Sequence, residues 1–148
     1  MKKYISLIIS LIAFVFSPFY LQAQKRDVKF EHLSIEHGLS QSSVTDIIQD
    51  SRGFMWFGTL DGLNKFDGYE ITVYQNSLED STSIADNYIT SLYEDEAENL
   101  WVGTQNMGLC IYNKIKDNFI NVKHCKNQNN CLSNNQIRVI YQDMNGTL

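Results

Sequence analysis

Short apolar stretches, each closed by a turn rich in Asp, Asn and Gly, follow one another along most of the chain. The first group of four covers residues 44–49, 55–59, 63–67 and 70–74, and β-branched and aromatic side chains recur in it. Asp accepts backbone N–H bonds and Gly adopts positive φ, so the text between the stretches favours tight turns. Stretches of this length joined by a few residues predict four strands paired as an antiparallel meander.

The same pattern starts again at Ile89 and a third time at Ile137, which follow Val44 at successive intervals of 45 and 48 residues. Trp56 and Trp101 hold the same place in the first two copies. A period in the forties with a fixed Trp is typical of β-propeller blades. The sequence therefore predicts an all-β fold of β-propeller blades with four antiparallel strands each. The set is incomplete: an outer strand at 28–33, blades at 44–74 and 89–122, and a partial blade at 137–148.

The lone strand at 28–33 aligns with the fourth stretch of each blade and stands before the first full copy. Such a strand can complete the last blade of a ring and cover two sheet edges at once. Closed propellers take about four to eight blades, and repeats of this kind need neighbours to bury their faces. We therefore interpret residues 24–148 as the N-terminal part of a propeller that belongs to a longer protein.

Residues 1–23 carry the pattern of a secretory signal peptide, with Lys2 and Lys3 before a short apolar run. Cleavage is expected between Ala23 and Gln24; an uncleaved anchor is the alternative, although the run is shorter than the roughly 20 residues of a membrane span. Loss of the two lysines changes the formal charge from −5 to −7. No basic patch with interleaved aromatic residues is present, so nucleic acid is not an expected partner of this segment.

The three cysteines suggest little chemistry beyond a disulfide. Cys125 and Cys131 share one connecting loop, where an exported protein can either join them or keep them as thiols. Cys110 lies in a predicted strand and reads as a small buried apolar residue. A metal site built on His124 and the two loop cysteines would lack a fourth ligand. No metal site and no cofactor are expected.

Catalytic residues are not recognisable in the sequence, because His32, His37 and His124 stand in no nucleophile setting and no phosphate loop or nucleophile elbow is present. In a propeller, the loops between second and third strands and the loops between blades emerge at the same end. Polar residues in these loops are therefore weak candidates for ligand contact, with solvated turn residues as the alternative: Asp61, Gln105 and Asn106. The repeated Trp56 and Trp101 are interpreted as core residues, with ligand stacking as the alternative.

Taken together, several motifs resemble the two-component regulator propeller repeat. The first copy carries Gly38-Leu39-Ser40, then Gly53-Phe54-Met55-Trp56-Phe57-Gly58-Thr59 and Asp61-Gly62-Leu63-Asn64. The second copy carries Leu100-Trp101-Val102-Gly103-Thr104 and departs from the family pattern at Glu98, where Gly is usual. The resemblance covers residues 28–148.

This resemblance implies a periplasmic sensor region of a hybrid two-component system histidine kinase of Bacteroidetes type. Members of the family combine the propeller with an immunoglobulin-like domain, a membrane span in the inner membrane and a cytoplasmic kinase that starts a phosphorelay. The implied ligands are oligosaccharides, and the implied partners are the remaining propeller blades of the parent chain and, for the parent, a second copy in a homodimer. The alternative is a secreted or periplasmic propeller scaffold or binding module without a kinase; a propeller enzyme is disfavoured by the lack of an acid–base set.

Overall fold

The computed structural model describes residues 29–125 and 131–148. The chain divides into two compact units, residues 1–31 and 32–148, and all the elements below belong to the second unit. The predicted signal peptide at 1–23, with its cleavage between Ala23 and Gln24, lies outside the described residues. In the part of the chain that the structure describes, no helix is long and apolar enough to cross a membrane.

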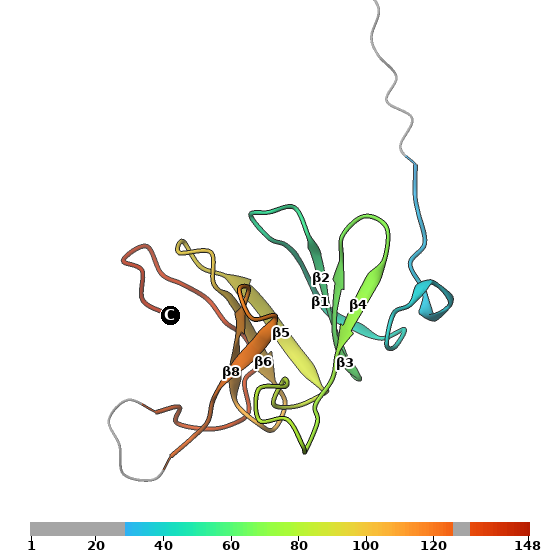
Figure 1. Cartoon of the computed structure of the whole chain (residues 1–148). Coiled ribbons are helices and arrows are strands. Elements are labelled where there is room, and N and C mark those ends of the chain that lie inside the picture. Colours follow the sequence, from blue (N-terminus) through green and yellow to red (C-terminus); the bar gives the residue numbers. More distant parts are fainter. Residues whose placement is uncertain (1–28, 126–130) are drawn as a thin grey trace, which may run out of the picture. The chain divides into compact units, whose positions relative to one another are not determined.

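Two four-stranded antiparallel sheets make up the second unit (Figure 1). The first sheet has the order β1-β2-β3-β4, with β1 at Val44–Gln49, β2 at Met55–Thr59, β3 at Gly62–Phe66 and β4 at Ile71–Tyr74. The second has the order β5-β6-β7-β8, with β5 at Ile89–Glu94, β6 at Leu100–Thr104, β7 at Leu109–Asn113 and β8 at Asn118–Val122. A short 3₁₀ turn, η2 at Ile35–His37, precedes the first sheet. The predicted all-β fold of four-stranded antiparallel meanders is confirmed, and both sheets are open.

The core lies where the two sheets face each other. Trp56, Leu63, Ile89 and Val102 have no exposed surface. Gly58 permits this approach: a Cβ on it would lie 2.8 Å from Cγ2 of Ile89, closer than real side chains come. The missing side chain therefore lets the first strand of one sheet approach the second strand of its neighbour.

The outer strand predicted at 28–33 is not observed. Residues 29–33 form no strand in the structure. A strand needs a partner to receive its backbone hydrogen bonds, and no pairing involves these residues in the described chain. The pattern at 28–33 records strand propensity, but the paired state also depends on a neighbouring blade.

The third copy, at 137–148, also forms no strand, yet it follows the path of a blade's start. Thr90 Oγ1 donates to the carbonyl of Ile137 at 2.7 Å, as Thr45 Oγ1 donates to the carbonyl of Ile89 at 2.8 Å. A Cβ on Gly103 would lie 2.7 Å from Cγ2 of Ile137, which repeats the contact of Gly58. The contact between successive copies therefore recurs, although the sheet that would extend it is not formed.

Candidate ligand-binding surface

An Asp at the end of the first strand organises one end of each sheet. Asp50 accepts bonds from the backbone N–H of Phe54 at 2.9 Å and from the indole N–H of Trp56 at 2.9 Å. Asp95 does the same for Asn99 N–H at 2.8 Å and the indole of Trp101 at 2.8 Å. In each sheet one carboxylate therefore accepts hydrogen bonds from both the turn backbone and the indole N–H of the Trp. We call this carboxylate the Asp cap, because its role is structural.

The pKa of the Asp50 carboxyl reflects this role. Burial alone would raise that pKa, but the bonds from Trp56 and Phe54 together with the charge of Arg52 outweigh burial and lower it below 3.8. The Arg52 guanidinium lies 3.3 Å from Oδ2 of Asp50. The sequence predicted Asp50 and Asp95 as turn residues and missed the bond to the indole; its signal is the constant six-residue spacing between each Asp and its Trp.

The sequence-predicted candidates lie in the loops that follow the second strand of each sheet. Asp61 accepts a bond from the Asn87 side chain at 3.1 Å, and its carbonyl accepts one from Gln75 at 3.0 Å. Asn106 donates through its backbone N–H to Asp86 at 3.0 Å. These two residues thus tie the loops to residues 75–88, the segment that connects the sheets.

Gln105 differs from its two companions: its backbone N–H donates to the carbonyl of Tyr88 at 3.0 Å, and its side chain bonds to none of the residues that the structure describes. Its side chain is only partly exposed. The structure therefore holds all three candidates within the loop network at this end and does not converge them on one cavity. Their role in ligand contact stays a prediction.

The connecting segment, residues 75–88, covers the outer edge of the second sheet. The backbone N–H of Phe119 in β8 donates to the carbonyl of Thr82 at 2.8 Å. The side chain of Asn121 donates from Nδ2 to the carbonyl of Ser83 at 2.9 Å and to that of Ser81 at 3.4 Å. An open strand edge invites unwanted pairing, and this segment occupies part of the edge of β8.

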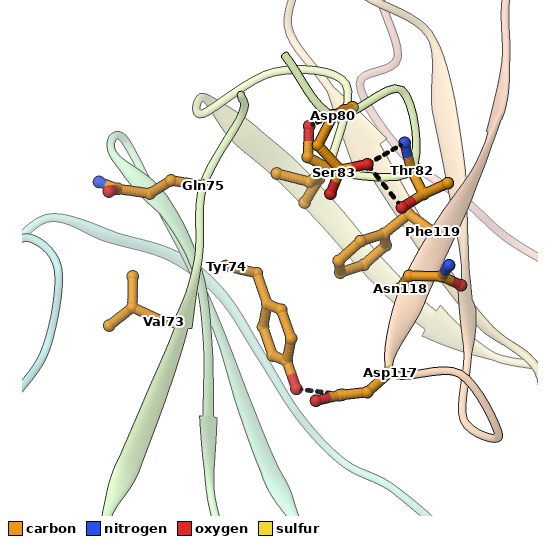
Figure 2. Close-up of a pocket in the computed structure, with 10 residues that line it drawn as sticks. Val73, Tyr74, Gln75, Asp80, Thr82, Ser83, Asp117, Asn118 and Phe119 are labelled. Carbon is orange, nitrogen blue, oxygen red and sulfur yellow. Dashed lines mark hydrogen bonds between the residues drawn. The ribbon is translucent and has the colours of Figure 1, made fainter. Parts of the chain in front are cut away.

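Between the end of β4, the connecting segment and the start of β8 lies a hollow of about 190 Å³ (Figure 2). We call it the joint hollow; residues 73–75, 80, 82–84 and 117–119 line it. Figure 2 shows Tyr74 pointing from β4 toward Asp117 and Phe119 of the second sheet. The Tyr74 and Phe119 ring centroids lie 5.4 Å apart with edge-to-face geometry, a preferred arrangement for buried rings.

Asp117 accepts hydrogen bonds from the hydroxyls of two tyrosines, one from each sheet. Its Oδ1 accepts from Tyr74 at 2.6 Å and from Tyr112 at 2.5 Å. These bonds, that of Tyr112 first, lower the pKa of Asp117 against the opposing effect of burial. Burial, together with the bond to Asp117, raises the pKa of Tyr74. The polar atoms here bond to one another, so the joint hollow serves first as a connection between sheets.

A second hollow of about 400 Å³ adjoins it and shares Asp80 and Ser83 with it. We call it the segment hollow, since most of its lining comes from the connecting segment; its lining residues are 76–78, 80, 81, 83, 85, 107, 121 and 123. Its volume falls within the range of about 300–1,000 Å³ that small-molecule sites occupy. Neither hollow could be predicted from the repeat pattern, because the lining positions do not recur between copies.

The remaining candidates concern cysteine and metal chemistry. A disulfide joins Cys125 and Cys131, whose Cα atoms lie 5.7 Å apart. Cys110 is buried, and burial raises the pKa of its thiol to about 11, so it is a poor nucleophile at neutral pH. Within residues 29–125 and 131–148, no group of three or more His, Cys, Asp and Glu side chains is placed to hold a metal ion.

Comparison with known proteins adds a family match. The two component regulator propeller model matches residues 38–61 and 83–106. Each match begins before the first strand of a sheet and ends in the loop after its second strand. This register makes Asp61 and Asn106 equivalent positions.

A curated relative, Histidine kinase P4 from Formosa agariphila, is 50% identical over 78 residues, which are 53% of this chain and 6% of the relative. The extracellular domain of the hybrid two component system BT3049 from B. thetaiotaomicron superposes with a TM-score of 0.73 and 34% identity, covering 78% of this chain and 16% of that one. The extracellular domain of BT4673 from the same organism gives a TM-score of 0.63 and 25% identity, with 82% and 17% covered. The chain thus spans a small fraction of each relative.

Proposed function

We propose that this chain, which carries two copies of the two-component regulator propeller repeat, is a ligand-sensing segment in the propeller of a two-component sensor. The observation that carries the proposal is the agreement between repeat and structure. Each match covers the first two strands of one four-stranded sheet, and the same pair of sheets superposes on the extracellular domain of a hybrid two component system. The chain itself supplies no catalytic group in this proposal; the kinase belongs to the parent protein.

Export to the periplasm is part of the proposal, with the parent anchored in the inner membrane. Both solved relatives are extracellular domains, and residues 1–23 carry the leader pattern. The joined Cys125 and Cys131 suit an oxidising compartment. N-terminal sequencing of the protein from the cell envelope is expected to begin at Gln24. An intact Met1 terminus in the membrane fraction would contradict cleavage.

Further blades of the parent are the proposed partners of the second sheet. An apolar hollow of about 360 Å³ lies on it, between Leu109 of β7 and the third copy, including Ile137 and Tyr141. Repeats of this type bury such surfaces against the next repeat. A homodimer of the parent is proposed on the family resemblance alone.

The proposed ligands are oligosaccharides, which would bind at the end of the sheets where the connecting segments lie. Support comes from the segment hollow, whose lining mixes hydroxyl, amide and apolar groups. A binding site for a sugar needs both kinds of group, because sugars present hydroxyls and apolar C–H faces. Signalling would then pass from the propeller to a kinase and its phosphorelay.

The test uses the complete protein that contains this chain. Membranes carrying it are incubated with a panel of oligosaccharides, and autophosphorylation is measured with and without each sugar. A change specific to one sugar supports the sensor function. Sugar binding by a complete protein whose reading frame encodes no kinase would favour the alternative, a propeller binding module or scaffold.

A further inference from the structure

Asn121, which lines the segment hollow, carries an unexplained polar atom. Oδ1 of Asn121 is buried and has no hydrogen-bond partner, and among the residues that the structure describes it is the one such side-chain atom. Nδ2 of the same side chain already holds the carbonyls of Ser81 and Ser83, so the amide orientation is fixed by its partners. A buried acceptor without a donor destabilises the fold, because the group has lost its hydrogen bonds to water. A donor that reaches this atom would recover that free energy.

Two charged side chains of opposite sign line the same hollow. Among the described residues, the side chain of Lys123 has no ion-pair or hydrogen-bond partner, so its ammonium can donate to a ligand. Asp80 uses Oδ1 for Thr82 at 2.8 Å and 2.7 Å, which leaves Oδ2 as an acceptor. The hollow therefore offers acceptors and a donor together, and its net charge is zero.

The apolar part of the lining comes from Met107, Leu78 and Ala85. Met107 is 44% exposed and Leu78 is fully exposed, although both are large apolar side chains. Exposed apolar groups beside convergent polar atoms are the usual composition of a small-ligand site. The C–H face of a sugar ring is the complement to such a lining.

We propose that the segment hollow is the ligand site and that it takes one or two rings of a neutral oligosaccharide. Ring hydroxyls donate to Oδ1 of Asn121 and Oδ2 of Asp80 and accept from Lys123, while Met107 packs against a C–H face. The carboxylate of an acidic sugar would be attracted to the ammonium of Lys123 but repelled by the carboxylate of Asp80. The inference rests on the proposed sensor function and assigns its ligand a place and a charge class.

Access to the Asn121 oxygen requires a local movement, because residues 81–83 cover it. Three hydrogen bonds hold these residues on β8: one from the backbone N–H of Phe119 and two from Asn121. Binding therefore shifts these residues and alters the protection of the Phe119 amide. Hydrogen exchange at this amide therefore reports on the movement of residues 81–83.

The test measures binding of neutral hexasaccharides (malto-, cello-, manno-, xylo- and laminari-series) and of oligogalacturonates and oligoalginates to the complete protein by calorimetry. The Met107→Trp variant fills the hollow and is expected to weaken neutral sugar binding at least about tenfold, and Lys123→Ala about three- to tenfold. The matched controls are Ile115→Trp, at a 93% exposed apolar position outside the hollow, and Lys116→Ala. Both controls are expected to bind as the wild type does.

The outcomes separate the two proposals. Wild-type binding that survives in both Met107→Trp and Lys123→Ala, with unchanged exchange at Phe119, overturns this site and leaves the sensor function standing. Tight binding of acidic sugars that Lys123→Ala abolishes overturns the neutral class. Failure of every neutral and acidic sugar to bind overturns the site and the oligosaccharide ligand together. Melting temperatures of all variants, measured in parallel, exclude loss of fold as the cause.

Discussion

The two sheets carry the same Trp in the same bond, yet the two rings differ in burial. The indole of Trp56 donates to Asp50 at 2.9 Å and that of Trp101 donates to Asp95 at 2.8 Å. Trp56 has no exposed surface, whereas Trp101 is only partly buried. Position within a repeat thus fixes the hydrogen bond of the ring, but it does not fix the burial.

The neighbouring sheet accounts for the difference. Tyr112 of the second sheet packs edge-to-face on Trp56 with ring centroids 4.8 Å apart, and Tyr74 stacks on it at 5.9 Å. No third four-stranded sheet lies over Trp101 in the described residues. In a repeat protein, each unit completes the core of the unit before it, and stability is shared between neighbours.

The largest expected effect tests this account. Trp56→Ala should lower the free energy of unfolding of the complete protein by about 3–5 kcal/mol, because it leaves a cavity at the junction of two sheets. Trp101→Ala should cost as much there, but less in the isolated chain, where Trp101 is already partly exposed. Urea unfolding of both variants in both forms measures this. An equal and large loss in the isolated chain would show that the burial of Trp101 does not depend on a further blade.

The alternative, that the two Trp rings stack on a ligand, predicts a different result. In that case the variants would lose sugar binding while their stability stays unchanged.

A smaller effect is expected at the glycines that let the copies approach. Gly58→Ala would place a Cβ 2.8 Å from Ile89, which is fully buried and cannot move aside; overpacking of this kind costs about 1–3 kcal/mol. Gly103→Ala meets Ile137, which is only partly buried and can yield, so a smaller loss is expected in the isolated chain. Gly68→Ala, with nothing within 4 Å of its Cβ, measures the cost of a side chain at positive φ without overpacking; Gly58 and Gly103 have no positive φ and carry no such strain. Thermal melting ranks the stability of the three variants. Equal losses of stability in Gly58→Ala and Gly103→Ala would contradict the difference expected between the two contacts.

Much of the fold followed from the sequence because the elements are local and repeated. The third strand was predicted at 63–67 and runs at 62–66; the fourth was predicted at 70–74 and runs at 71–74. Residues 29–33 and 137–148 form no strand here for a shared reason. Strand propensity is a property of the segment, but a strand exists only when a neighbour accepts its hydrogen bonds.

The site was much less predictable. Asp61 and Asn106 could be selected because both are polar residues in a loop that follows a predicted second strand, and the structure shows them holding loops. Asn121 and Lys123, which line the segment hollow, give no repeat signal. Their relevance depends on where residues 75–88 fold, and that path has no counterpart in hydrophobic periodicity.

Asp50 and Asp95, the two Asp caps, should contribute differently to the loss of stability at low pH. The pKa of Asp50 and that of Asp95 are both lowered, since bonds from the turn and the Trp outweigh burial. A lowered folded-state pKa gives stability that is present above about pH 3.9 and is lost as the pH falls through the folded value. Asp50→Asn should therefore cost about 1.5 kcal/mol at pH 7 and flatten the fall in stability below pH ~4.

Asp95→Asn should show a weaker form of the same change. Asp50 pairs with Arg52, but Ala97 holds the corresponding place in the second sheet, where Asn99 supplies a neutral donor instead. Urea unfolding between pH 2.5 and 7 measures both profiles. If Asp95→Asn flattens the profile more than Asp50→Asn does, the ion pair is not what distinguishes the caps.

The smallest expected effect concerns the joint between the sheets, where the two differ in sequence. Tyr74 and Val122 are equivalent, since each pairs with the Leu of its third strand, but only Tyr74 reaches across to Asp117. Tyr74→Phe removes the hydroxyl and keeps the ring between Trp56 and Phe119, so the cost should be about 1 kcal/mol. Tyr112 still donates to Asp117, which therefore keeps a partner.

Asp117 has a φ of 53°, a strained value for a residue with a side chain, and Asp117→Gly would relieve that strain while losing both bonds. A double-mutant cycle of these two substitutions, followed by urea unfolding, isolates the bond between sheets. A coupling near zero would mean that the aromatic rings alone hold the two sheets together and that the hydroxyl of Tyr74 is dispensable.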